Sequence, residues 1–114
     1  MHNLVVRIDC REIVDWESFH RVFAEVMGFP DFYGKNMDAW IDCMSSLDSP
    51  GDGMTKIHAP PKGVVVLQLE HVEEFAVRCP EQYAALIECS AFVNWRRIEA
   101  GEEAVLAISF WKVR

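Results

Sequence analysis

The sequence predicts an α/β fold, in which a small three-stranded parallel sheet packs against about four helices in the order β-α-α-β-α-α-β. Three short runs of mainly apolar residues, at 4–8, 64–69 and 104–110, have the length and composition of strands. Two segments with the apolar periodicity of helices lie between each pair of runs. This alternation favours parallel strands that are joined by helical connections.

The composition indicates a globular protein with an acidic surface. At 114 residues, the chain is long enough for one hydrophobic core, and we expect residues 1–114 to form a single domain. Eighteen acidic and 11 basic residues give a net charge of −7, which argues against a nucleic-acid partner and favours a positively charged one. No apolar run approaches the roughly 18 residues of a membrane span, so we expect no membrane association.

The N-terminus and the cysteines indicate where the protein is found. The first residues, M-H-N-L-V-V-R-I-D, lack the layout of a signal peptide. In a chain without an export signal, four scattered cysteines in apolar or helical contexts are expected to be reduced and buried. They are Cys10, Cys43, Cys79 and Cys89. We therefore expect a soluble, cytoplasmic protein.

The first helix has clear signals at both ends. After the first strand and a turn at Cys10–Glu12, Asp15 is placed to cap a helix that runs to about Met27. The expected buried face consists of Phe19, Val22, Phe23 and Val26. Gly28 is the expected C-terminal stop, and Pro30 prevents the helix from continuing.

The second helix has the most regular pattern in the chain. It lies in the stretch P-D-F-Y-G-K-N-M-D-A-W-I-D-C-M-S-S-L, which runs from Pro30 to Leu47. Apolar residues at helical spacing define one face, namely Met37, Trp40, Ile41, Met44 and Leu47. Asn36 is a preferred N-cap residue, and Gly34 permits a sharp change of chain direction before it.

Asp38 and Asp42 lie one turn apart on the other face of this helix. Like charges at this spacing destabilise a helix by roughly 0.2–0.5 kcal/mol. The helix dipole favours Asp38 in the first turn but does little for Asp42, which lies a turn deeper. Two interpretations remain open: a solvated polar face opposite the core, or a carboxylate pair that binds a positively charged group.

The middle of the chain combines a long loop with a buried strand. Residues 48–63 contain three prolines and three glycines and have no periodicity, so we expect a loop that is either functional or mobile. The run V-V-V-L-Q-L at 64–69 is nearly continuously apolar, which predicts burial on both faces of the sheet.

Two further helices are expected before the last strand. The first is short and is marked by the apolar residues Val72, Phe75, Ala76 and Cys79. Pro80 ends it and suits the first position of the next helix, which runs from about Glu81 into the nineties. Its inward residues are expected to be Tyr83, Leu86 and Ile87. Because the periodicity blurs around Asn94, a bend or frayed turn is expected there, and Gly101 closes the helix.

Catalytic and metal-binding patterns are largely missing. No cysteine pair has CxxC spacing, and no histidine lies at metal-ligand spacing, so neither a metal nor another cofactor is expected. There is also no phosphate-binding glycine loop and no nucleophile elbow. Asp38 and Asp42 as the acid and base of a small hydrolase remain an alternative, although an exposed helix face is a poor place to shift a carboxylate pKa.

The segment F-Y-G-K-N-M-D-A-W-I-D-C-M resembles the signature of the barstar family, intracellular inhibitors of barnase-type ribonucleases. The matching residues, at the family's spacing and without a gap, are Tyr33, Gly34, Asn36, Asp38, Ala39, Asp42 and Cys43. Helical amphipathicity alone would not fix the pattern Y-G-x-N-x-D-A-x-x-D-C. The predicted order of strands and helices is also similar to that of the family.

The resemblance implies an immunity-type inhibitor that binds a basic, extracellular-type ribonuclease one-to-one and blocks its active site. Asp42 would replace an RNA phosphate, and Asp38 would pair with a second basic group. Contacts from the preceding loop would come from Phe32, Tyr33, Gly34 and Asn36. Ile41 and Ser45 would lie at the rim, and Glu88 on the last helix would add a further acid.

The sequence departs from the family pattern at three positions. The family often has a tyrosine in place of Phe32, an acid in place of Lys35 and an aromatic residue in place of Ile41. The 48–63 loop is interpreted as an insertion beside the binding face. These differences lead us to expect a cognate nuclease other than barnase. A barstar-like module that binds a non-nuclease basic partner is the alternative.

Overall fold

The computed structural model describes residues 2–112 and confirms the predicted α/β fold. The three strands are β1 (Leu4–Asp9), β2 (Val65–Glu70) and β3 (Leu106–Trp111). They form one parallel sheet in the order β1-β2-β3, with Val65 of the central strand opposite Leu4 on one side and Leu106 on the other.

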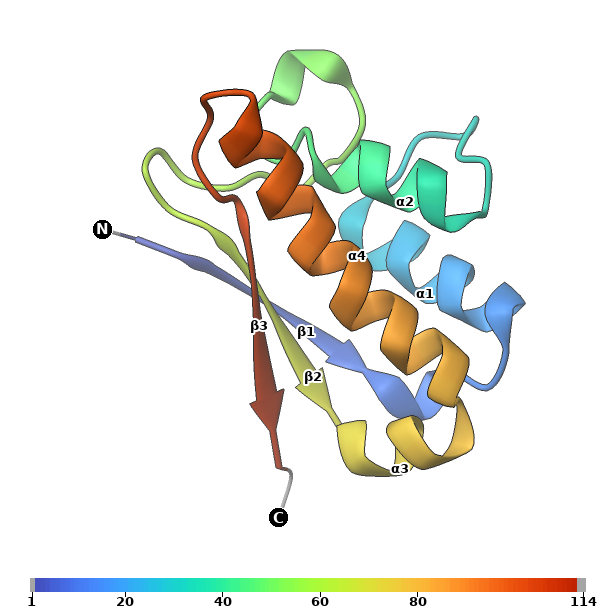
Figure 1. The fold of residues 1–114 in the computed structure, drawn as a ribbon. Helices are drawn as coiled ribbons and strands as arrows, with labels where there is room; N and C mark the ends of the chain where they lie inside the picture. Colours follow the sequence, from blue (N-terminus) through green and yellow to red (C-terminus); the bar gives the residue numbers. More distant parts are fainter. Residues whose placement is uncertain (1, 113–114) are drawn as a thin grey trace.

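The helices follow the expected order. They are α1 (Trp16–Met27), α2 (Met37–Met44), α3 (Val72–Arg78) and α4 (Pro80–Glu99), with short 3-10 helices at Cys10–Glu12 and Pro50–Asp52. Figure 1 shows α1, α2 and α4 grouped on one side of the sheet, whereas α3 lies near the C-terminal ends of the strands. The acidic helix α2 therefore belongs to a layer of helices that packs on one face of the sheet.

The predicted helix ends are confirmed by their hydrogen bonds. The Asp15 carboxylate accepts from the backbone N–H of Ser18 at 2.8 Å, and the Ser18 hydroxyl completes a capping box. Gly28 ends α1 with a φ of 69°, in the left-handed region. The Asn36 side-chain oxygen accepts from the backbone N–H of Ala39 at 2.8 Å and caps α2.

The core lies between the sheet and the helical layer. Phe23 of α1 and Trp40 of α2 are fully buried, and their rings meet edge to face with centroids 5.6 Å apart. Such aromatic pairs bury large apolar areas, so this contact fixes α2 against α1. Val26, which was expected on the buried face of α1, is half-buried.

The prediction that β2 is buried on both faces was wrong. Val65, Leu67 and Leu69 are fully buried, whereas Val66 and Gln68 on the opposite face are half-buried. The reason is that the helices cover one face of the sheet and leave the other largely open (Figure 1). The composition of the strand did not reveal this, because Val66 is apolar on the uncovered side as well.

The expected bend around Asn94 was also wrong, because α4 continues without interruption from Pro80 to Glu99. The side-chain amide of Asn94 donates to the carbonyl of Leu106 at 2.7 Å, and its oxygen accepts from the N–H groups of Val105 and Leu106. The apolar pattern blurs there because a polar side chain points inward and joins α4 to the start of β3. Of the residues predicted to face inward, Leu86 is fully buried, and Tyr83 and Ile87 are half-buried.

The 48–63 loop is held in place at several points. The backbone N–H of Lys56 donates to the carbonyl of Met27 at 2.9 Å, and that of Ala59 donates to Leu47 at 2.8 Å. Thr55 is buried, and its hydroxyl donates to the carbonyl of Ile57. These bonds tie the loop to the ends of α1 and α2, which favours one fixed conformation.

Candidate partner-binding site

The two faces of α2 have opposite character. The inward face contains Trp40, Cys43 and Met44, all of which are buried. Asp38 and Asp42 lie outward, and the side chain of Asp42 is 60% exposed. The packing of the apolar face fixes the helix, so both carboxylates are presented on one surface at consecutive turns.

The loop before α2 extends this surface. Phe32 is 75% exposed, and Gly34 and Asn36 are exposed next to it. A large aromatic side chain that is exposed in this way costs hydration free energy, which a partner would recover by covering it. The structure thus brings Phe32, Gly34 and Asn36 to the N-terminal end of the acidic face.

Tyr33 and Ile41 are placed differently from the other predicted site residues, because only 8% and 9% of their surfaces are exposed. The Tyr33 hydroxyl lies 2.6 Å from Nδ1 of His20, and burial raises the pKa of this tyrosine. Burial, with a contribution from the charge of Lys35, lowers the pKa of His20. Tyr33 thus anchors the loop to α1, and its direct contact with a partner stays a prediction, as does that of Ile41.

Ser45 ends α2 and meets a cation from α4. Its hydroxyl donates to the carbonyl of Ile41 at 2.6 Å and accepts from Nη2 of Arg96 at 2.8 Å. The same Arg96 nitrogen lies 3.3 Å from Oδ1 of Asp42. Two of the predicted contact residues, Asp42 and Ser45, therefore share one arginine within the protein itself.

Arg97, the next residue, holds the C-terminal end of α2 from beneath the surface. Its side chain is 6% exposed, and it binds both oxygens of Asp48 at 3.0 and 2.7 Å. It also donates to the carbonyls of Ser45 and Glu103, each at 2.8 Å. The hydrogen bond from Arg97 holds the pKa of Asp48 below its usual range. We call this set of bonds the Arg97 clamp.

Glu88 is exposed on α4, as a contact residue would be. Burial raises the pKa of the neighbouring Cys89, and the negative charges of Glu88 and Asp38 raise it further. The direct contact of Glu88 with a partner stays a prediction.

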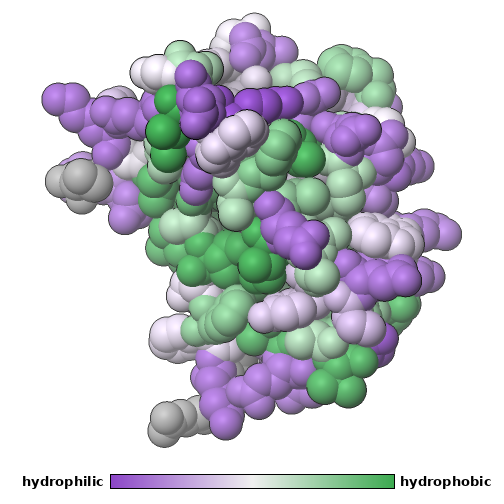
Figure 2. Space-filling model, viewed as in Figure 1, coloured by the Kyte–Doolittle hydropathy of each residue, from purple (hydrophilic) through white to green (hydrophobic). Residues whose placement is uncertain are grey.

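An aromatic surface on α4 was not predicted from the sequence. Phe92 and Trp95 are exposed, and their ring centroids are 5.6 Å apart; Ile98 is exposed one turn further along. Figure 2 shows apolar side chains gathered across the middle of the face that includes α4 and β3. The sequence signal was present but was obscured, because Asn94 and the two arginines interrupt the helical pattern in the nineties.

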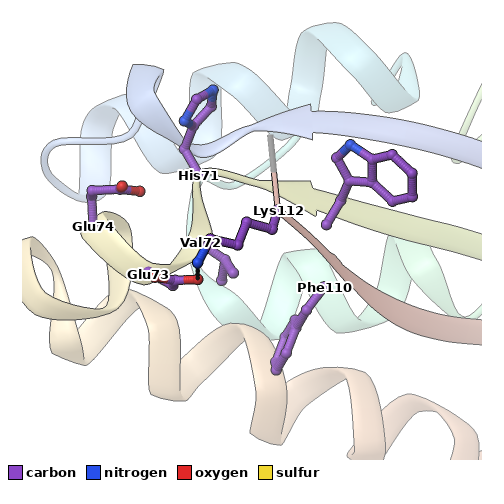
Figure 3. Close-up of a pocket in the computed structure, with 7 residues that line it drawn as sticks. His71, Val72, Glu73, Glu74, Phe110 and Lys112 are labelled. Carbon is purple, nitrogen blue, oxygen red and sulfur yellow. Dashed lines mark ion pairs between the residues drawn. The ribbon is translucent and has the colours of Figure 1, made fainter. Parts of the chain in front are cut away.

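A shallow pocket of about 130 Å³ lies at the C-terminal ends of β2 and β3 (Figure 3). Its lining consists of His71, Val72, Glu73, Glu74, Phe110, Trp111 and Lys112. Figure 3 shows Lys112 reaching across to Glu73, and their charged atoms are 3.9 Å apart. None of the predicted site residues lines this pocket, so it is distinct from the acidic face of α2.

Residues 2–112 contain neither a group of side chains suited to hold a metal ion nor a helix suited to span a membrane. Within residues 2–112, no three His, Cys, Asp or Glu side chains are grouped as metal ligands would be. No helix among these residues combines the length and apolar character needed to cross a membrane. The four cysteines are free; Cys10, Cys43 and Cys79 are buried, and Cys89 is half-buried.

The chain matches a known protein family over most of its length. The family model described as Barstar (barnase inhibitor) covers residues 3–108, from the start of the fold into β3. No curated protein matches the chain. The family match includes α2, the loop before it and the residues of α4 that contact it.

Proposed function

The chain belongs to the barstar family of barnase inhibitors, and we propose that the acidic face of α2 performs the inhibition by filling the basic active site of a barnase-like ribonuclease. The observation that carries this proposal is the exposure of Asp38 and Asp42 on a helix whose opposite face is locked in the core. Members of this family are inhibitors and not enzymes, which excludes the hydrolase alternative.

Asp42 acts as the phosphate mimic in this proposal. A ribonuclease holds RNA phosphates with arginine and lysine, and a carboxylate offers these groups the same charge-assisted hydrogen bonds. Asp38, one turn away, pairs with a second basic group of the target. One inhibitor molecule fills one active site, so binding is one-to-one.

The surrounding residues complete the interface. Phe32, Gly34 and Asn36 supply contacts from the loop, and the exposed 75% of Phe32 makes it the aromatic anchor. Tyr33 and Ile41 contribute through the small surfaces that they expose. Ser45 at the end of α2 and Glu88 on α4 lie at the rim.

The net charge of −7 supports association with a basic, extracellular-type enzyme, because opposite charges steer the encounter and raise the association rate. Phe32, Lys35 and Ile41 differ from the family pattern, so the cognate enzyme is a nuclease other than barnase. We place the inhibitor in the cytoplasm as one domain. Its four free thiols support this location, since a reducing compartment keeps cysteines unpaired.

Titration calorimetry against a barnase-type ribonuclease, with RNA cleavage measured in parallel, tests the proposal. Asp42→Ala is expected to weaken binding by about 2 kcal/mol or more, which is the loss typical of an interface hot spot. The values that define this threshold include a substitution in a barstar. Glu12→Ala is the matched control, since it removes one exposed negative charge from the short 3-10 helix after β1.

Tight one-to-one binding that Asp42→Ala weakens and Glu12→Ala leaves nearly unchanged would support the phosphate mimic. Equal effects of the two substitutions would contradict it. If the wild-type protein bound a basic partner but left RNA cleavage unchanged, the alternative of a non-nuclease binding module would replace the proposal.

A further inference from the structure

Arg96 and Arg97 are neighbours in α4, but their contacts with α2 differ in kind. The side chain of Arg97 is 6% exposed and binds both oxygens of Asp48, at 3.0 and 2.7 Å, so it is a fixed part of the fold. The side chain of Arg96 is 43% exposed and reaches Asp42 at 3.3 Å. Charge-assisted bonds of this type are usually about 2.7–2.9 Å long, so the contact of Arg96 is loose and accessible to solvent.

Arg96 bonds to two residues of this protein that the proposed function places in contact with the nuclease, Asp42 and Ser45. Its Nη2 atom donates both to Asp42 and to the hydroxyl of Ser45, which is 2.8 Å away. A target arginine that approached Asp42 as it would approach a phosphate would need the same carboxylate oxygens. The two guanidinium groups would also repel each other at close range.

We propose that Arg96 is an internal counter-cation of Asp42, which the basic group of the nuclease must displace, and that Arg96 thereby sets which nucleases bind. This inference rests on the proposed function of Asp42. Exposed ion pairs are weak, so a well-placed target arginine in a desolvated cleft can replace Arg96. A basic group that is poorly placed gains too little to displace it.

Arg96 also disfavours binding after it has been displaced from Asp42. Once Arg96 leaves Asp42, its positive charge remains at the edge of the surface that faces a basic cleft. Like charges that face each other across an interface disfavour binding. Removal of Arg96 should therefore strengthen binding, whereas truncation of an interface side chain usually weakens it.

The test compares Arg96→Ala with Arg7→Ala in binding to the same barnase-type ribonuclease. Arg7 is a matched control because it is also exposed and pairs with a carboxylate, Glu70, at 2.7 Å, but it lies on the open face of the sheet. Both substitutions change the net charge by the same amount. Arg96→Ala is expected to lower Kd about 2- to 5-fold more than Arg7→Ala does, the range that corresponds to loss of one exposed ion pair.

Two further variants sharpen the test. Arg96→Gln, which keeps the length and polarity of the side chain, is expected to strengthen binding in the same direction. In a protein that already carries Asp42→Ala, most of the gain from Arg96→Ala should disappear, because there is no carboxylate left to compete for. Thermal unfolding of each variant checks that it is folded.

The outcomes separate this inference from the function on which it rests. If Asp42→Ala weakens binding but Arg96→Ala gains no more than Arg7→Ala, the counter-cation is refuted and the proposed function stands. If Arg96→Ala weakens binding, Arg96 is itself a contact with the nuclease, and the inference is again wrong. If the wild-type protein neither binds nor inhibits the ribonuclease, both fall together.

Discussion

Removal of the Arg97 side chain should destabilise the protein far more than its position near the end of a helix suggests. In Arg97→Ala, the carbonyls of Ser45 and Glu103 lose their guanidinium donor, and the carboxylate of Asp48 loses both of its bonds to Arg97. The two carbonyls were satisfied by a side chain that is 6% exposed, so water replaces these bonds only after local rearrangement.

The magnitude follows from these lost bonds. Breaking a buried ion pair by removal of one partner typically costs about 3–5 kcal/mol. The Asp48 side chain is 42% exposed and can be partly rehydrated, which places the expected loss at the lower end, about 3 kcal/mol. For a protein of this size, such a loss corresponds to a fall in Tm of roughly 10–15 °C.

Urea unfolding followed by tryptophan fluorescence measures this loss, and Arg96→Ala is the control. Arg96 is adjacent in sequence and also pairs with an aspartate, but it is exposed, so its removal should cost less than about 1 kcal/mol. Similar losses for the two variants, or a loss below about 1 kcal/mol for Arg97→Ala, would refute the reasoning that burial gives the Arg97 clamp its strength.

Three other effects are expected. Tyr33→Phe should cost about 1–3 kcal/mol in urea unfolding, because it leaves Nδ1 of buried His20 without its partner. Asn94→Ala, which removes three bonds to the backbone at the start of β3, should cost a similar amount without disrupting α4 in circular dichroism. Arg97 lowers the pKa of Asp48, so the stability contributed by this carboxylate is complete above the unfolded pKa, about 4, and is lost as the pH falls through the folded pKa. Asp48→Asn should therefore make unfolding less pH-dependent below about pH 4.

The helix ends and the two faces of α2 could be predicted from the sequence because local chemistry determines them. Asp15 and Asn36 satisfy backbone N–H groups within three residues of themselves, and Gly28 adopts a conformation that other residues disfavour. The spacing of apolar residues then separates the buried side of α2 from Asp38 and Asp42. The residues that determine these features lie within a few positions of the helix ends and faces that they define.

The remaining features depend on contacts between distant segments. Nothing near Arg97 in the sequence indicates that it will bind Asp48, which is 49 positions away. Tyr33 belongs to the family signature and is therefore predicted to contact a partner. The signature does not indicate its hydrogen bond with His20. The burial of β2 depends on which face of the sheet the helices cover, and that is decided by the packing of the whole chain.

The Arg97 clamp also bears on when the inhibitor becomes competent during synthesis. β1 pairs with β2, and Asn3 already bonds to Val64, 61 residues later in the chain. Contacts of such sequence separation slow folding, because a long loop must close before they form. Because α2 precedes α4 in the chain, the acidic helix leaves the ribosome well before α4 does, and its C-terminal end is fixed only when Arg97 bonds to Ser45 and Asp48. Shortened chains that end before α4 would carry Asp38 and Asp42 on a segment that lacks its final anchor.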